Sequence, residues 1–188
     1  MAYFPPFRFS AALFLGAALL LSGCCANDVC DCQDEQADAI RVRFSPAFSP
    51  SDLDTLIVKR YSLPLSPASK VDSVTLVQGA GQERDSITVV LNNNTPFAAV
   101  GANKLDKFGY QIRYLTQQPR QKPKPTTVLI IESIQLDGQL DGDGCCTCYT
   151  NSLKTVTAKV NGKKPGAAPD SVVVVNLKQP RSSLEVLK

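Results

Sequence analysis

Cysteines carry the most evident chemistry in this chain, and all but one of the seven fall into two short groups. In extended chain, residues two apart point to the same face, so each group presents a pair of thiols on one side. Two such pairs can face one another as disulfides, or they can offer four thiolates to a metal ion. The groups are Cys25, Cys30 and Cys32 near the start and Cys145, Cys146 and Cys148 late in the chain.

The composition excludes several other chemistries. The chain has no His, which rules out Ser-His-Asp and Cys-His catalysis and every His-containing zinc or copper site. It also has no Trp, and its single Met is Met1, so Trp sugar platforms and Met-rich copper sites are absent. The acidic residues cluster near the start and in expected turns, so no carboxylate pair can be nominated for acid–base catalysis. We therefore expect no enzyme, and a carboxylate hydrolase has no feature in its favour.

The first residues form a leader. Residues 1–8 carry one Arg and no acidic residue, and Phe9 to Leu21 is almost unbroken Ala, Leu, Phe and Gly. A membrane-spanning helix needs about 20 apolar residues, and this run is shorter. The pattern is typical of a secretion signal, which we expect to form a short helix.

At the end of the apolar run stands Leu21-Ser22-Gly23-Cys24, an aliphatic residue and two small residues before a cysteine. This resembles the lipobox of bacterial lipoproteins. The resemblance implies that residues 1–23 are removed and that Cys24 becomes a lipidated first residue, with palmitate among its acyl chains. One chain binds a bilayer marginally, whereas two or three anchor a protein stably. An ordinary signal peptide cut nearby is the alternative.

The lipobox predicts a location in the envelope of a Gram-negative cell. Cys25 follows the lipidated residue, where the best-known inner-membrane retention signal has Asp. We therefore favour the outer membrane, at its periplasmic side or at the cell surface.

An extracytoplasmic location favours disulfides for the six remaining cysteines. A bridge between the two groups closes a loop of more than a hundred residues, which stabilises by about 4–5 kcal/mol through loop entropy. Six connectivities between the groups remain open. A metal site at Cys30, Cys32, Cys146 and Cys148 is the weaker alternative, because zinc ligand pairs usually have two to four residues between them. A redox-active or free thiol is a third, and we expect no cofactor.

Removing residues 1–23 takes away one Arg, so the 20 basic and 17 acidic side chains become 19 and 17. This near-neutral charge does not indicate nucleic-acid binding. The remaining 165 residues suffice for one domain with a core. We assign residues 24–38 to an acidic, cysteine-bearing tether and 39–188 to the folded domain.

The folded domain shows the period-two alternation of half-buried strands. In the first, Ile40, Val42 and Phe44 share one face and Arg41 and Arg43 the other. The continuous apolar runs Val128 to Ile131 and Val172 to Val175 predict central strands buried on both faces. Strands are expected at 40–44, 55–61, 71–77, 86–91, 110–116, 127–136, 155–160 and 171–177.

Short strands separated by turn residues predict an all-β fold with a single β-sandwich, because each one-sided sheet needs another to cover it. We expect an immunoglobulin-like or related Greek-key architecture, without the cysteine and tryptophan spacing of antibody domains.

The stretch Asp137 to Gly144 alternates Asp and Gly. Its oxygen-bearing residues match the first positions of a calcium-binding EF-hand loop, but Cys148 stands where that loop requires Glu. Asp-Gly steps also supply the positive φ angles of tight turns, so we expect a hairpin turn here and keep a weak calcium site as the alternative.

Four segments share the pattern Asp, hydroxyl residue, aliphatic residue. The pattern resembles the acceptor motif of an O-glycosylation system of some Gram-negative bacteria, which would modify Thr55, Ser73, Ser86 and Ser171. Each match also begins an expected strand, where Asp and Ser close the preceding turn, and we favour that structural interpretation.

The basic, Pro-rich stretch Pro119 to Pro125 predicts an extended, hydrated loop. It could contact headgroups, lipopolysaccharide phosphates or an acidic partner, although a solvated connection is the simpler interpretation.

Together these features predict a lipid-anchored binding or scaffolding module of the cell envelope, stapled by disulfides, whose partner is an envelope protein or a glycan. A lipid-anchored cysteine protein that binds metal or handles redox chemistry is the alternative.

Overall fold

The computed structural model describes Cys30, Cys32 and residues 34–78, 87–116, 122–143, 146–160, 171–177 and 182–188. The leader, Cys24, Cys25, Cys145 and Ser86 lie outside the described residues. The elements are α2 Asp34–Ala37, β1 Ile40–Phe44, α3 Pro50–Leu53, β2 Thr55–Ser62, β3 Val71–Val77, β4 Thr88–Leu91, η2 Leu105–Lys107, β5 Phe108–Thr116, β6 Lys124–Asp143, β7 Cys146–Val160, β8 Ser171–Asn176 and β9 Leu184–Val186.

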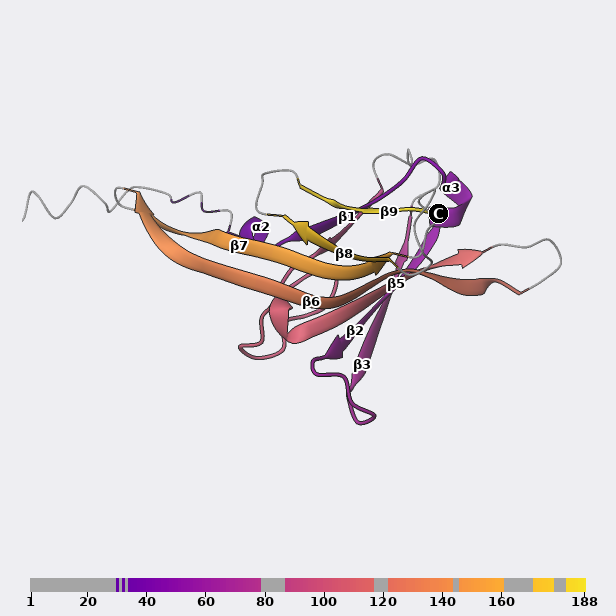
Figure 1. Cartoon of the computed structure of the whole chain (residues 1–188), viewed down its shortest axis with the longest axis horizontal. Coiled ribbons are helices and arrows are strands. Elements are labelled where there is room, and N and C mark those ends of the chain that lie inside the picture. The colour runs from indigo at the N-terminus through magenta and orange to yellow at the C-terminus, as the bar shows by residue number, and fades with distance from the viewer. Residues whose placement is uncertain are drawn as a thin grey trace, which may run out of the picture.

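These strands form two sheets, which confirms the predicted all-β sandwich (Figure 1). The larger sheet has the order β3-β2-β5-β6-β7-β8, and the smaller has β4-β1-β9. All pairings in the larger sheet are antiparallel, and β5 to β8 follow one another as a meander. In the smaller sheet β1 is antiparallel to β4 and parallel to β9.

The predicted alternation positions the core. In β1 the residues at 40, 42 and 44 are buried while the two arginines between them are exposed. In β2 Leu56 and Val58 turn inward, and in β5 Ile112 does so. Phe48 fills the space between the sheets with its ring edge-on to both Phe44 and Tyr114, a favoured aromatic geometry. One apolar cluster therefore joins both sheets.

Two strands are much longer than the sequence predicts. β6 was expected over 127–136 and β7 over 155–160, but they extend to Asp143 and back to Cys146. β5 pairs only with residues 124–131 of β6, and β8 only with 155–160 of β7. Residues 136–143 and 146–154 therefore pair with each other alone, as a two-stranded ribbon that we call the arm. At about 3.3 Å per residue the arm is about 25 Å long, and it projects beyond the sandwich in Figure 1.

The prediction of a central strand at Val172 to Val175 was wrong. β8 is an edge strand of the larger sheet, with Val172 54% and Val174 67% exposed. Only Val173 and Val175 pack against the core. A run of four valines lacks the polar alternation that distinguishes an edge from a centre. In the interior strand β6, by contrast, Val128, Leu129 and Ile131 are buried as expected.

Among the described residues, helix is limited to short pieces. In the part of the chain that the structure describes, no helix is long and apolar enough to cross a membrane.

Core packing gives a direct test on one strand. Leu129 is fully buried in β6, whereas Leu140 lies 68% exposed on the same strand. We expect Leu129→Ala to lower the free energy of unfolding by about 2–5 kcal/mol through lost burial and a cavity, and Leu140→Ala by less than about 0.5 kcal/mol. Urea unfolding of both variants measures the difference, and equal losses would contradict this core assignment.

Candidate functional site at the stapled arm

Two disulfides fasten the N-terminal segment to the arm. Cys30 is bonded to Cys146 and Cys32 to Cys148, with Cα–Cα distances of 5.4 and 5.2 Å. The expected pairing of one cysteine group with the other is thereby confirmed. Cys25 and Cys145, the remaining candidates, lie outside the described residues.

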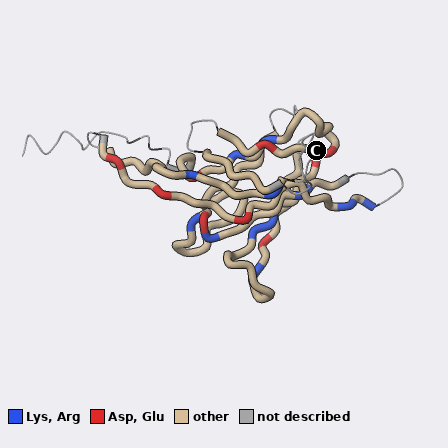
Figure 2. Tube along the Cα trace, viewed as in Figure 1, with Lys and Arg blue, Asp and Glu red and all other residues tan. Residues whose placement is uncertain are grey.

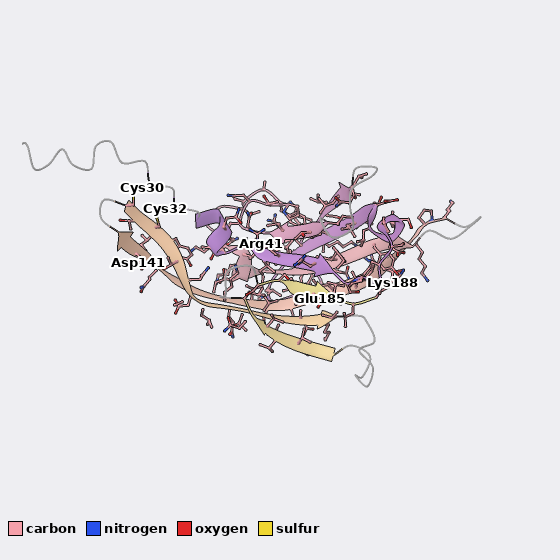
Figure 3. All side chains as sticks on the ribbon, turned by 90° about the horizontal axis from the view of Figure 1, so that it is seen from above. Cys30, Cys32, Arg41, Asp141, Glu185 and Lys188 are labelled. Carbon is pink, nitrogen blue, oxygen red and sulfur yellow. A yellow bond between two sulfur atoms is a disulfide. The ribbon has the colours of Figure 1, made fainter. Side chains whose placement is uncertain are left out.

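The N-terminal segment runs along β7 from the far end of the arm toward the sandwich. Both bridges have the same sequence separation of 116, so two steps along this segment match two steps along β7 in the same direction. Figure 3 shows Cys30 and Cys32 beside the end of the arm. We call Cys30, Cys32 and residues 34–38 the stem. Its last turn, α2, packs against β7.

The four-thiolate metal hypothesis does not fit this arrangement. Sulfur atoms joined in disulfides are not thiolates, and thiolates are the form that binds zinc. Among the described residues, no group of three or more metal-ligating side chains is gathered in one place.

The predicted turn at Asp137 to Gly144 was also wrong. Residues 137–143 are extended strand in the arm, so Asp137 and Asp141 are spaced along a ribbon instead of around a calcium loop. A glycine is needed here for close packing: a Cβ on Gly138 would lie 2.5 Å from the Tyr149 hydroxyl and 2.6 Å from the Thr150 carbonyl oxygen. This packing accounts for Gly138 alone, since a Cβ on Gly142 would meet nothing within 4 Å.

A buried carboxylate joins the stem to the sandwich. Asp38, the last residue of the expected tether, is only 3% exposed. Its oxygens accept hydrogen bonds from Asn93 Nδ2 at 3.1 Å and Asn151 Nδ2 at 3.0 Å. Asn93 Oδ1 in turn accepts from the backbone N–H of Leu105 at 2.8 Å. One carboxylate thus links the stem, the arm and the loop after β4.

Lys154 completes this network. Its Nζ donates to the Ala37 carbonyl oxygen at 3.0 Å, and that oxygen also accepts from Asn151. Burial lowers the pKa of Lys154, with Asp38 opposing the shift and Arg41 adding to it. The Lys154 ammonium and the Asp38 carboxylate are both buried, and burying either charge is costly unless its hydrogen bonds are made. The hydrogen bonds of this network therefore fix the stem to the sandwich.

A second polar cluster lies away from the arm, on β2 and β3. Arg60 is buried between the rings of Phe97 and Phe108, 4.6 Å from each centroid. Its guanidinium donates to Asp72 Oδ2 at 2.8 Å and to the Ala98 carbonyl oxygen at 3.1 Å. These contacts hold the edge strand β3 and the loop after β4 against β2.

A small pocket of about 80 Å³ opens beside Arg60, with Tyr61, Lys70, Asp72 and Phe108 in its lining. The hydrogen bond from Arg60 lowers the pKa of Asp72, burial opposes this, and Lys70 lowers it further. With its charges already paired, the pocket offers a ligand little beyond shape.

The candidate glycosylation sites do not cluster. Thr55 begins β2 and is half-buried, as the structural interpretation predicts. Ser73 lies exposed inside β3, so that interpretation fails there. Ser171 begins β8, and its side chain, like all of Ser86, lies outside the described residues. Modification at these positions stays a prediction.

The two ends of the long strand β6 differ in charge. Figure 2 shows acidic residues along the arm, which include the exposed Asp137 and Asp141. Of the basic Pro-rich stretch, Lys122 and Lys124 are described, and they are exposed at the opposite end.

The sequence patterns alone did not identify Arg60 and Asp38 as the centres of the two polar clusters. Arg60 had a signal, because it shares the inward face of β2 with Leu56 and Val58. A charge on an apolar face predicts a buried partner. Asp38 had no such signal. It follows several other acidic residues, and nothing in the local sequence distinguishes it from them.

Comparison with protein-family models, with curated proteins and with solved structures found no match to this chain.

The second disulfide to form should stabilise the fold less than the first. By the entropy of loop closure, the first bridge closes 116 residues and stabilises by about 5 kcal/mol, whereas the second closes a loop of a few residues and adds about 2 kcal/mol. Replacing one bonded pair by serines should therefore cost about 2 kcal/mol, and replacing both pairs about 6–7 kcal/mol.

Urea unfolding measures these losses. All variants should carry Ser at positions 25 and 145, so that only the two described bridges differ. Single losses that add up to the loss of the double replacement would show that the bridges do not act as one staple.

The Arg60 cluster predicts a dependence on acid. Because the folded state lowers the pKa of Asp72, its carboxylate stabilises the fold above its ordinary pKa of about 3.9, and this contribution is lost as the pH falls through the lowered value. Asp72→Asn should cost about 1–2 kcal/mol at pH 7, a modest loss because solvent screens the half-exposed Asp72.

Urea unfolding at a series of pH values tests this. The wild type and Asp72→Asn should converge once the pH falls below the lowered pKa of Asp72. Asp141→Asn, a change to an exposed carboxylate on the arm, is the control and should lose little at any pH. A pH-independent cost of Asp72→Asn would contradict the ionic role of Asp72.

Proposed function

We propose that this chain is a lipid-anchored module of the bacterial cell envelope, favoured at the outer membrane, which binds or scaffolds a partner and holds it away from the lipid surface. The observation that carries the proposal is the position of the staple. The lipobox cysteine, Cys24, precedes Cys30 by six residues, and Cys30 is bonded to the far end of the arm.

The staple makes the arm a spacer between the lipid and the sandwich. The six residue steps from Cys24 to Cys30 span at most about 20 Å, so the lipid must lie near the end of the arm. The arm adds about 25 Å between that point and the sandwich. Without bridges, an unstructured tether of fifteen residues would allow the body to collapse onto the membrane, since such a chain averages about 20 Å end to end in any direction.

Charge does not by itself set this orientation. The arm exposes Asp137 and Asp141, and its strands carry no Lys or Arg up to Lys154, which is buried. Anionic headgroups repel carboxylates within about a Debye length, roughly 8–10 Å. The orientation with the arm toward the lipid therefore depends on the staple, and it leaves Lys122 and Lys124 at the distal end accessible to an acidic protein or glycan.

We propose a binding or scaffolding role in place of an enzymatic one. The hydrogen bonds of the described polar clusters, at Asp38 and at Arg60, join segments of the fold to one another. The second hypothesis, a metal or redox cysteine site, loses support because four of its cysteines are bonded in pairs.

Metabolic labelling tests the anchor. The full gene, expressed in a Gram-negative host with labelled palmitate, should yield a labelled membrane protein. Cys24→Ala should lose the label, and Cys25→Ala should keep it. Label in Cys24→Ala, or none in the wild type, would overturn the proposal.

The intact mass of the extracted protein gives an independent reading. We expect a chain that begins at Cys24 and carries acyl groups. Before reduction it should be lighter by about 4 Da with the two described bridges and by about 6 Da if Cys25 and Cys145 are joined as well. No change on reduction would contradict the staple.

A further inference from the structure

The edge strand β8 lacks the protection that edge strands usually have. Natural edges are protected by charges, prolines, bulges or a covering segment. β8 has the sequence Ser-Val-Val-Val-Val-Asn and pairs regularly with β7. Among the described strands no other pairs with it, and Figure 3 shows it along the outside of the sheet. Two of its valines, Val172 and Val174, are more than half exposed.

The hydrogen-bond pattern shows which backbone groups of β8 face outward. The N–H of Leu177 donates to the Lys154 carbonyl oxygen at 2.7 Å, which makes that pair a hydrogen-bonded one. In an antiparallel ladder hydrogen-bonded and non-bonded pairs alternate. Val175 and Val173 therefore bond to β7, and Val172 and Val174 direct their N–H and C=O groups to the open edge.

We propose that a second copy of this chain pairs with β8, antiparallel, about a two-fold axis through Val173. This register places Val172 opposite Val174 of the second copy, and Val174 opposite Val172 of the second copy. Each such pair exchanges two N–H···O=C bonds, so all the outward groups of these two residues are satisfied. The exposed side chains of the same residues meet on one face, where cross-strand β-branched pairs stabilise a sheet.

The strand itself favours a second copy over a different partner. A two-fold contact must be self-complementary, since each residue meets its own copy's counterpart. β8 achieves this because it carries no charge and its valines repeat with the period of the sheet. The opposite edge, β3, does not: Asp72 lies within it, and the exposed Lys70 precedes it. The joined sheet would have twice six strands, a size that open sheets reach.

Charge substitutions on the two edges test the pairing. The full-length protein, extracted in a large excess of detergent micelles, should have the protein mass of a dimer by light scattering. Val174→Lys should raise the dissociation constant of the dimer by roughly tenfold or more, because it places like charges at the junction. Val77→Lys changes a valine of similar exposure, 76%, on the β3 edge and should leave the dimer intact.

Val174→Thr guards against a folding artefact, since it keeps a β-branched neutral side chain and should remain dimeric. Circular dichroism and thermal melting establish that each variant is folded. A monomeric wild type, a dimer that Val174→Lys does not weaken, or equal dissociation by Val77→Lys would each overturn the proposal.

Discussion

The arm depends on the attachment of the stem. A two-stranded ribbon alone in water is marginally stable, because each strand has hydrogen-bond partners on one side and little apolar surface to bury. Here the far half of β7 is bonded through two disulfides and the near half through the buried carboxylate of Asp38. These attachments lie at both ends of the arm, so neither end can fray independently. The projection, and any role as a spacer, follows from them.

The two polar clusters both attach the loop after β4 to another element, but they do so with different chemistry. Asp38 accepts hydrogen bonds from two side-chain amides, and the buried Lys154 bonds to the neighbouring Ala37 carbonyl oxygen. The two terminal nitrogens of Arg60 donate to one carbonyl and one carboxylate, and its guanidinium lies over two aromatic faces. Each cluster joins the loop after β4 to another element, and that loop leads from the smaller sheet into β5 of the larger one. Buried charge, in both cases, holds the crossing between sheets in place.

The local residue pattern predicted the features that neighbouring residues in the sequence determine. Alternation gave the inward face of β1, and the i, i+2 spacing of the cysteines predicted that the two groups face each other, although six connectivities stayed open. The local pattern gave wrong predictions where contacts with residues distant in sequence determine the structure. Val172 to Val175 could not be identified as an edge, because its exposure depends on whether a strand lies beyond it. Asp137 to Asp143 was expected as a turn, because its strand character depends on the stem and β7 lying alongside. Asp38 became a central buried group only through Asn93 and Asn151, each distant in sequence.

The anchor and the dimer, both proposals, constrain one another. Antiparallel pairing of β8 about a two-fold axis reverses the direction of β7 between copies, so the two arms would project from opposite ends of the joined sheet. Both lipids can then reach one bilayer only if the dimer lies along it, with an arm bending toward the surface at each end. The register skips Glu132 and Ser152 where β6 and β7 pair, and such bulges bend and twist a ribbon. Two anchors in one membrane would also favour pairing, because confinement raises the effective concentration of the two edges.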